Sequence, residues 1–187
     1  VYSSPAVADG KAYVGSYDGK VYCLDASTGA HIWSHTIGSV HSSPAVADGR
    51  VYVGSFDCRV HCLDAITGAH IWNYTTEDLV TSSPAVADGK VYVGSWDHGV
   101  YCLEASTGAH IWSYGTPRMV ESSPAVADGK VYVGSYGKVY CLVASTGAHI
   151  WNYTTGNWES SPAVADGKVY VGSSDHRVYC LNALTGT

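Results

Sequence analysis

Positively charged residues are scarce in this sequence. Lysine and arginine together number 10, against 16 acidic residues, and the formal net charge is −6. Proteins that bind nucleic acid use clustered lysines and arginines to neutralise phosphates, so the composition argues against nucleic acid as a partner. Long apolar runs are lacking too: the chain has no stretch of about eighteen apolar residues, the length expected of a membrane-spanning helix. We therefore predict neither a nucleic-acid-binding protein nor a membrane span.

Motifs of enzyme chemistry are missing as well. The chain has no P-loop, no GxGxxG fingerprint and no recognisable Ser–His–Asp arrangement. It does not start with a methionine or a signal peptide, because Val1 already lies inside a repeat. We expect an excised or mature segment whose targeting signal is lost. No catalytic residue, cofactor or metal ligand is predicted.

The sequence does contain one unit of about forty residues, present five times. The segment SSPAVADG begins at Ser3, Ser42, Ser82, Ser122 and Ser160. A period of this length is typical of repeat architectures. Since the copies share one core, we expect residues 1–187 to form a single domain. Its repeats span 3–41, 42–81, 82–121, 122–159 and 160–187.

Each copy holds four short segments of strand character. In the third copy they read SSPAVA, KVYVGS, VYCLEA and AHIWSY. The Asp-Gly pair after the first segment favours a type I′ hairpin turn, which needs positive φ at both positions. The strands are apolar on both faces, as in sheets covered on both sides. Such repeated antiparallel sheets are typical of propeller blades, and we predict an all-β fold, a β-propeller of five four-stranded antiparallel blades.

The fifth copy is incomplete. It ends at Thr187, before the segment that supplies the fourth strand of the other copies. We therefore expect a last blade that lacks its outer strand, with a bare edge at 178–182 through which a homo-oligomer could pair. The prediction is a closed five-bladed ring. The alternatives are a segment of a larger propeller and a ring completed by another chain.

Five of the six cysteines occupy the same place in the third strand of each copy. Equivalent positions on different blades diverge, whereas a disulfide needs Cα atoms within about 7 Å. We interpret these residues as small buried core side chains, and the remaining one, Cys58, as a thiol in a turn. The five are Cys23, Cys62, Cys102, Cys141 and Cys180.

The segment LDASTGAHIW at 24–33 resembles the repeat of the quinoprotein (PQQ-dependent dehydrogenase) propellers, where it is called a tryptophan-docking motif. It recurs with small changes in the next three copies. The resemblance implies that each motif tryptophan packs between its own blade and the next, and it implies an extracytoplasmic or secreted location. Two glycosylation sequons, at Asn73 and Asn152, agree with secretion, whereas unpaired cysteines favour a reducing compartment. The docking tryptophans are Trp33, Trp72, Trp112 and Trp151.

The resemblance implies a fold and not an activity. The same repeat occurs in a lipoprotein of outer-membrane assembly and in sensor regions of some membrane-attached kinases. The family's enzymes carry Ca²⁺ ligands and a catalytic aspartate on long inserted loops, for which five nearly identical copies offer no place. We predict a non-enzymatic binding or scaffold propeller. The alternatives are a fragment of a quinone- or metal-dependent dehydrogenase and a purely structural surface repeat without a ligand.

The copies differ mainly in two loops, the turn after the second strand and the linker to the next blade. Both should emerge on one face of the disc, the variable face, whereas the uniform Asp-Gly and Ser-Thr-Gly turns emerge on the other. Loops on a rigid scaffold often bind ligands, and aromatic side chains suit a protein or glycan partner. Unselected drift of relaxed loops is the alternative. The candidate binding residues are Tyr17, Phe56, Trp96, His98, Glu121, Tyr136, Trp158 and Glu159.

The residues just before each Ser-Ser pair should surround the mouth of the central channel. Two glutamates and a histidine among them could hold a cation, and a hydrated acidic channel mouth is the alternative. These channel-mouth residues are Tyr2, His41, Thr81, Glu121 and Glu159.

Overall fold

The computed structural model describes residues 1–157 and 159–187. Within them all regular structure is β, in five antiparallel sheets of four, four, four, four and three strands. Each sheet is one repeat and follows chain order from the central channel outward. The predicted all-β propeller blades are confirmed, including the missing outer strand of the last one.

The strands have nearly the same bounds in every blade. The innermost strands are β1 (Ala6–Ala8), β5 (Ala45–Ala47), β9 (Ala85–Ala87), β13 (Ala125–Ala127) and β17 (Ala163–Ala165). The second strands are β2 (Lys11–Gly15), β6 (Arg50–Ser55), β10 (Lys90–Gly94), β14 (Lys130–Gly134) and β18 (Lys168–Ser173). The third strands are β3 (Lys20–Asp25), β7 (Arg59–Asp64), β11 (Gly99–Glu104), β15 (Lys138–Val143) and β19 (Arg177–Asn182). The outer strands are β4 (His31–Thr36), β8 (His70–Thr75), β12 (His110–Gly115) and β16 (His149–Thr154).

The Asp-Gly pairs set the first hairpin of each blade. In all five pairs both residues have positive φ, between 48° and 50° for the aspartates and between 68° and 71° for the glycines. This is the backbone of a type I′ turn, whose twist matches that of the strands it joins. The turn fixes the register of the blade: Ala6 pairs with Tyr13, Tyr13 with Cys23, and Cys23 with Trp33. One face of the blade therefore carries a row of Ala, Tyr, Cys and Trp.

Neighbouring blades pack through two different faces. The leading face of a blade carries this Tyr, Cys and Trp row together with a valine, and it packs on the trailing face of the next blade, which carries Val, Val, Leu and Ala. Between the first two blades the leading residues are Tyr13, Val21, Cys23 and Trp33, and the trailing residues are Val51, Val53, Leu63 and Ala65. All eight are buried.

Directional hydrogen bonds accompany this apolar contact. The hydroxyl of Tyr13 and the indole N–H of Trp33 both donate to the carbonyl of Ala65 in the next blade, at 3.0 and 3.2 Å. The same pair of bonds recurs at the other three interfaces. The glycine of the x-Thr-Gly turn in each following blade, where x is Ser, Ile or Leu, lies against the indole: a Cβ on Gly68 would lie 2.6 Å from the Trp33 ring. Each tryptophan thus contacts both its own blade and the next.

A ladder of serines joins the innermost strands around the channel. The backbone N–H of Ser4 donates to the hydroxyl of Ser43 at 2.9 Å, and the N–H of Ser43 donates to the hydroxyl of Ser83 at 2.8 Å. The ladder continues from Ser83 to Ser123 and from there to Ser161. In this ladder each serine hydroxyl accepts a hydrogen bond from a backbone N–H of the preceding blade, a donor that pairs with no strand of its own blade.

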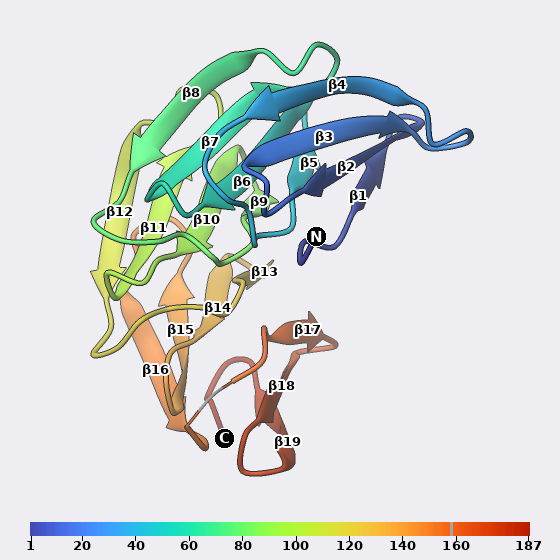
Figure 1. Cartoon of the computed structure of the whole chain (residues 1–187). Coiled ribbons are helices and arrows are strands. Elements are labelled where there is room, and N and C mark those ends of the chain that lie inside the picture. Colours follow the sequence, from blue (N-terminus) through green and yellow to red (C-terminus); the bar gives the residue numbers. More distant parts are fainter. Residues whose placement is uncertain (158) are drawn as a thin grey trace.

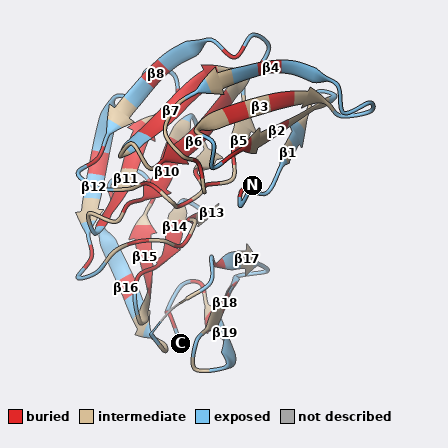
Figure 2. Ribbon diagram, in the orientation of Figure 1, coloured by how far each residue is buried: buried red, intermediate tan, exposed pale blue. Residues whose placement is uncertain are grey.

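The five blades form an open arc, and the predicted closed ring is wrong. Figure 1 shows the blades following one another from the β1–β4 sheet to the β17–β19 sheet, and Figure 2 shows burial concentrated in the middle of this series. Val178 on β19 is 78% exposed, whereas its counterparts Val60, Val100 and Val139 are fully buried. Nearly identical interfaces impose nearly the same rotation at each step, and five such steps do not complete the circle.

The exposure of the cysteines also depends on whether a following blade covers them. All six are free thiols. Cys23, Cys62, Cys102 and Cys141 are buried as expected, whereas Cys180 is exposed because no blade covers the leading face on which it lies. Among the described residues no helix is long and apolar enough to span a membrane.

Candidate binding face

Turns and linkers come together on one face of the blades, as the sequence predicted. The linker after the first blade bonds back to its own turn, from the N–H of Ile37 to the carbonyl of Gly19 at 2.7 Å. It also bonds forward, since the N–H of Phe56 donates to the carbonyl of Ser39 at 2.9 Å. The bond from Trp96 to Leu79 repeats this pattern in the next blade. The variable face is therefore a hydrogen-bonded surface and not a set of independent loops.

An aromatic cluster lies on this face at the first two blades. It consists of Tyr2, Tyr17, His41 and Phe56. His41 is at its centre, with ring centroids 4.8 Å from Tyr2, 5.2 Å from Tyr17 and 4.5 Å from Phe56. Tyr17 also contacts Tyr2 and Phe56 edge to face. Side chains from both blades thus form one continuous aromatic surface.

The two tyrosines of the aromatic cluster are its exposed part. Tyr2 is 76% exposed and Tyr17 is 54% exposed, whereas His41 and Phe56 are half-buried beneath them. The Nε2 atom of His41 is buried and has no hydrogen-bond partner within the described residues. Large exposed rings held in place by packing are typical of the centre of a binding surface.

Trp96 is the corresponding residue of the third blade. Its indole N–H donates to the hydroxyl of Thr81 at 2.9 Å, which holds the ring at the channel mouth. The following Asp97 accepts hydrogen bonds from the N–H of Glu77 and from the hydroxyl of Tyr101, at 2.9 and 2.8 Å. His98, exposed and with φ of 74°, is at the tip of the turn. Trp96 is therefore less exposed than Tyr2 and Tyr17 of the aromatic cluster.

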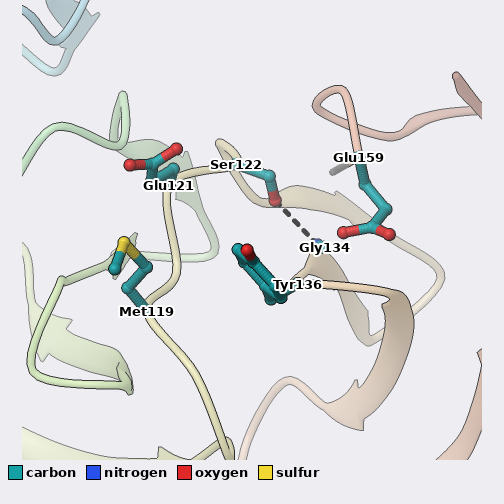
Figure 3. Close-up of a pocket in the computed structure, with 6 residues that line it drawn as sticks. All are labelled: Met119, Glu121, Ser122, Gly134, Tyr136 and Glu159. Carbon is teal, nitrogen blue, oxygen red and sulfur yellow. Dashed lines mark hydrogen bonds between the residues drawn. The ribbon is translucent and has the colours of Figure 1, made fainter. Parts of the chain in front are cut away.

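An acidic pocket is lined by residues of the third and fourth repeats (Figure 3). Its lining residues are Met119, Glu121, Ser122, Gly134, Tyr136 and Glu159. The hydroxyl of Ser122 accepts a hydrogen bond from the N–H of Gly134 at 2.7 Å and closes the inner wall. Tyr136 lies under the guanidinium of Arg118, which is 5.6 Å from its ring centroid.

Both carboxyl groups of this pocket have a raised pKa. Burial raises the pKa of Glu121 and of Glu159. For Glu159 the hydrogen bonds from the Thr155 hydroxyl and from the N–H of Gly137, the latter 2.8 Å long, offset part of this effect. A positively charged group entering the pocket would be attracted to both carboxylates and would lower both pKa values.

The arrangement suits the side chain of a partner better than a cofactor or metal. The cavity volume of the pocket is about 20 Å³, far below the roughly 300–1,000 Å³ of most small-molecule sites. Figure 3 shows Glu121 and Glu159 on opposite sides of Ser122, so the carboxylates do not converge on one point. Within the described residues no group of three His, Cys, Asp or Glu side chains could hold a metal ion.

The structure places most of the candidate residues in three adjoining groups on the variable face. Tyr17 and Phe56 belong to the aromatic cluster, Trp96 and His98 to the third blade, and the remaining described ones to the acidic pocket. Trp158 lies outside the described residues. Sequence reasoning placed Tyr2 and His41 at the channel mouth and did not connect them with Tyr17. The shared offset of these positions within each repeat is the signal that could have done so.

A family model described as outer membrane protein assembly factor BamB matches the chain at residues 1–74, 56–136 and 100–187. Among curated proteins the sequence has no match. Among solved structures, BamB from Moraxella catarrhalis is 26% identical, with a TM-score of 0.86 over 99% of this chain and 59% of that chain.

Two further structures share the fold. The computationally designed Ika8 protein is 21% identical, with a TM-score of 0.88 over 99% of this chain and 59% of that one. A quinohemoprotein alcohol dehydrogenase, ADHIIG from Pseudomonas putida HK5, is 20% identical, with a TM-score of 0.82 over 98% of this chain and 40% of the enzyme. The chain thus spans about three fifths of the length of the first two structures.

Proposed function

Because this chain belongs to the BamB family of PQQ-repeat β-propellers, we propose that it is a non-enzymatic binding module that holds a protein partner on its variable face. The family model is described as an outer membrane protein assembly factor, which supports a protein as the partner. An extracytoplasmic location belongs to the same proposal. Because a quinohemoprotein alcohol dehydrogenase shares this fold, a fragment of such an enzyme is the alternative, but nothing in the described residues favours it.

The aromatic cluster is the observation that carries the proposal. Burying exposed aromatic rings against a partner is favourable, and a cluster of such rings on a surface is typical of a site that a partner covers. Tyr2 and Tyr17 project from a base of His41 and Phe56 that is already packed, so little side-chain entropy remains to be lost on binding.

The acidic pocket adds charge to this apolar surface. A partner segment with an aromatic or aliphatic side chain for the aromatic cluster and a lysine or arginine for Glu121 and Glu159 would match both features. Such a segment would be an extended peptide that follows the curve of the face. A glycan could stack on Tyr17 but would gain less from the two carboxylates, so we favour a protein.

A peptide-display selection tests the proposal. Random peptides are selected on the immobilised chain, and the enriched peptide is titrated against wild type, Tyr17→Ala and Trp96→Ala. Loss of a central aromatic contact should cost about 2 kcal/mol, or roughly thirty-fold in affinity. The matched control is Ile66→Ala, an exposed apolar side chain on a uniform turn. Peptides that bind wild type and Tyr17→Ala equally would refute the proposed face, and binding only on a glycan array would identify a sugar as the ligand.

A further inference from the structure

Histidines are concentrated at the interface between the first and second blades. Four of the nine histidines of the chain lie there, whereas each of the next two interfaces has one at its outer rim, His110 or His149. The four come from both sides of the interface: His35 on β4, His41 at the end of the linker, His61 on β7 and His70 on β8. This interface therefore differs from the others in its chemistry, although its backbone is the same.

Three of these histidines occupy positions that form an aromatic contact in the later blades. At the next interface the ring centroid of Tyr74 is 5.7 Å from that of Tyr101 and 6.0 Å from that of His110. The strand register places three histidines at the equivalent positions of the first interface: His35, His61 and His70. Histidine changes its charge between pH 5 and 8, and tyrosine does not. Two neutral rings are thus replaced by rings that can become charged.

His61 is buried at this interface, and a proton can bind to it there only at a cost. Its Nε2 is 3.0 Å from a carboxylate oxygen of Asp57, so the neutral ring carries its hydrogen on Nε2 and a lone pair on Nδ1. Nδ1 is buried and has no hydrogen-bond partner among the described residues. A proton bound to Nδ1 would create a buried donor without an acceptor, whereas water would accept from it once the interface is open.

The charged groups around His61 favour the neutral ring on balance. Burial, with smaller contributions from His70 and Arg59, lowers the pKa of His61, and Asp57 opposes this effect. Asp57 also contacts Arg59, at 3.9 Å. The facing strand β4 contains no acidic residue, and it adds His35. Acid therefore adds positive charge to both sides of the interface without a matching supply of carboxylates.

His41 repeats this situation at the channel mouth. It lies between Tyr17 of the first blade and Phe56 of the second, with ring centroids 5.2 and 4.5 Å away. Its Nε2 is likewise buried without a partner, and the ring forms no ion pair within the described residues. Of the three buried side-chain atoms that lack a partner in this part of the chain, two are thus histidine nitrogens of one interface.

We propose that the interface between the first and second blades is a pH-sensitive contact, which opens in mildly acidic solution while the other three interfaces stay closed. The opened state binds protons at these histidines more readily than the closed state does, so acid shifts the equilibrium toward opening. The aromatic cluster spans the same interface, and opening would separate Tyr17 from Phe56. The opening itself does not depend on whether a partner binds the variable face.

The four interfaces can be followed separately, because a buried cysteine lies in each. Cys23 belongs to the first interface, and the later ones contain Cys62, Cys102 and Cys141. The chain is treated with a pyridyl disulfide reagent between pH 7 and 5. Mass spectrometry then gives the modification rate of each cysteine relative to its rate in the denatured chain at the same pH. For one histidine that titrates near pH 6.5 only in the opened state, the opened fraction should rise about 25-fold over this range. We expect such a rise at Cys23 and not at the other three.

Restoring the tyrosine pair is the matched control. The double variant His35→Tyr/His61→Tyr has the aromatic contact of the later interfaces and should lose most of the rise at Cys23. A rise that survives undiminished in this variant would overturn the proposal. Equal pH dependence at all four cysteines would overturn it as well, because it would indicate that acid unfolds the whole chain.

The reverse change tests whether the histidines are sufficient. Tyr74→His/Tyr101→His places the pair at the second interface and should transfer a pH-dependent rise to Cys62. Circular dichroism at pH 7 checks that the variant folds, and Tyr101→His alone serves if the double change does not. A folded variant in which Cys62 stays protected at pH 5 would show that these positions do not control the opening.

Discussion

The tryptophan contact between blades can be tested by adding a single methyl group. Gly108 lies in the Ser-Thr-Gly turn of the third blade with φ of 73°, and a Cβ there would lie 2.6 Å from the ring of Trp72 in the preceding blade. Gly89 has nearly the same φ, 70°, but a Cβ on it would meet nothing within 4 Å. The two alanine variants share the backbone penalty, and Gly108→Ala alone adds the steric one.

The magnitudes follow from this comparison. An L-residue in the left-handed region costs about 1 kcal/mol, which we expect for Gly89→Ala. Overpacking a tight contact adds about 1–3 kcal/mol, so Gly108→Ala should lower the free energy of unfolding by roughly 2–4 kcal/mol. The Cβ would press on ring atoms of an indole whose N–H is held at 3.0 Å by the Ala105 carbonyl, so the ring cannot swing away without losing that bond.

Urea denaturation followed by far-ultraviolet circular dichroism measures both variants under the same conditions. The useful quantity is the difference in unfolding free energy between Gly108→Ala and Gly89→Ala, because it removes the backbone penalty common to both. A difference near zero would refute the reasoning, since it would mean that the turn moves freely away from the tryptophan. The same comparison can be repeated with Gly147, which faces Trp112 at the next interface.

Two further predictions concern a buried histidine and the thiols. In the second blade His61 replaces the tyrosine that donates to the turn aspartate in other copies. Its Nε2 contacts Asp57 at 3.0 Å, and its buried Nδ1 has no hydrogen-bond partner among the residues that the structure describes. Burial lowers the pKa of His61, against the opposing effect of Asp57. As the pH drops below about 6.5, the unfolded chain therefore binds a proton at this histidine before the folded chain does, and the free energy of unfolding should fall. In urea titrations His61→Tyr should reduce this loss between pH 7 and 5, and an unchanged pH dependence would contradict the prediction. Cys180 should react fastest with a disulfide reagent, and Cys58 should react more slowly. The four buried thiols should react only on unfolding; one of them is Cys62, whose pKa burial raises to about 12. Rapid reaction of all six thiols in the native protein would show that the blades do not pack as described.

The fold of one blade could be predicted from the sequence because it depends on short-range sequence patterns. The Asp-Gly pairs specify a turn with positive φ at two consecutive residues, and the alternation in VYCL assigns Cys102 and Leu103 to opposite faces. The structure places these two residues in different apolar clusters, one on each side of the blade. Repetition then supplies the remaining information, since every copy repeats the same pattern.

Closure of the ring could not be predicted in the same way. It depends on the angle between successive blades, which is a property of the whole packed interface, including Tyr13, Trp33 and Leu63, and no local pattern encodes that angle. The presence of five copies predicts a circle of five blades only if each blade is a wedge that turns the chain by one fifth of the circle. The exposure of Val178 shows that the wedge is narrower than this assumption required.

The sequence predicts on which face the candidate residues lie, but it does not predict which of them contact one another. Tyr17 and Phe56 lie on the face expected of them, because strand direction alone decides where a turn emerges. Their contact through His41 depends on the offset between neighbouring blades, a tertiary feature. The raised pKa of Glu121 likewise comes from burial at the channel mouth, which the sequence does not report.

The serine ladder and the paired faces have a consequence for how such a chain can evolve. Each repeat meets its predecessor and its successor through the same atoms, from Ser4 and Ser43 onward. A gene duplication that inserts or removes one whole repeat would therefore create no new kind of junction, and selection could vary the circumference of the protein without redesigning a single side chain.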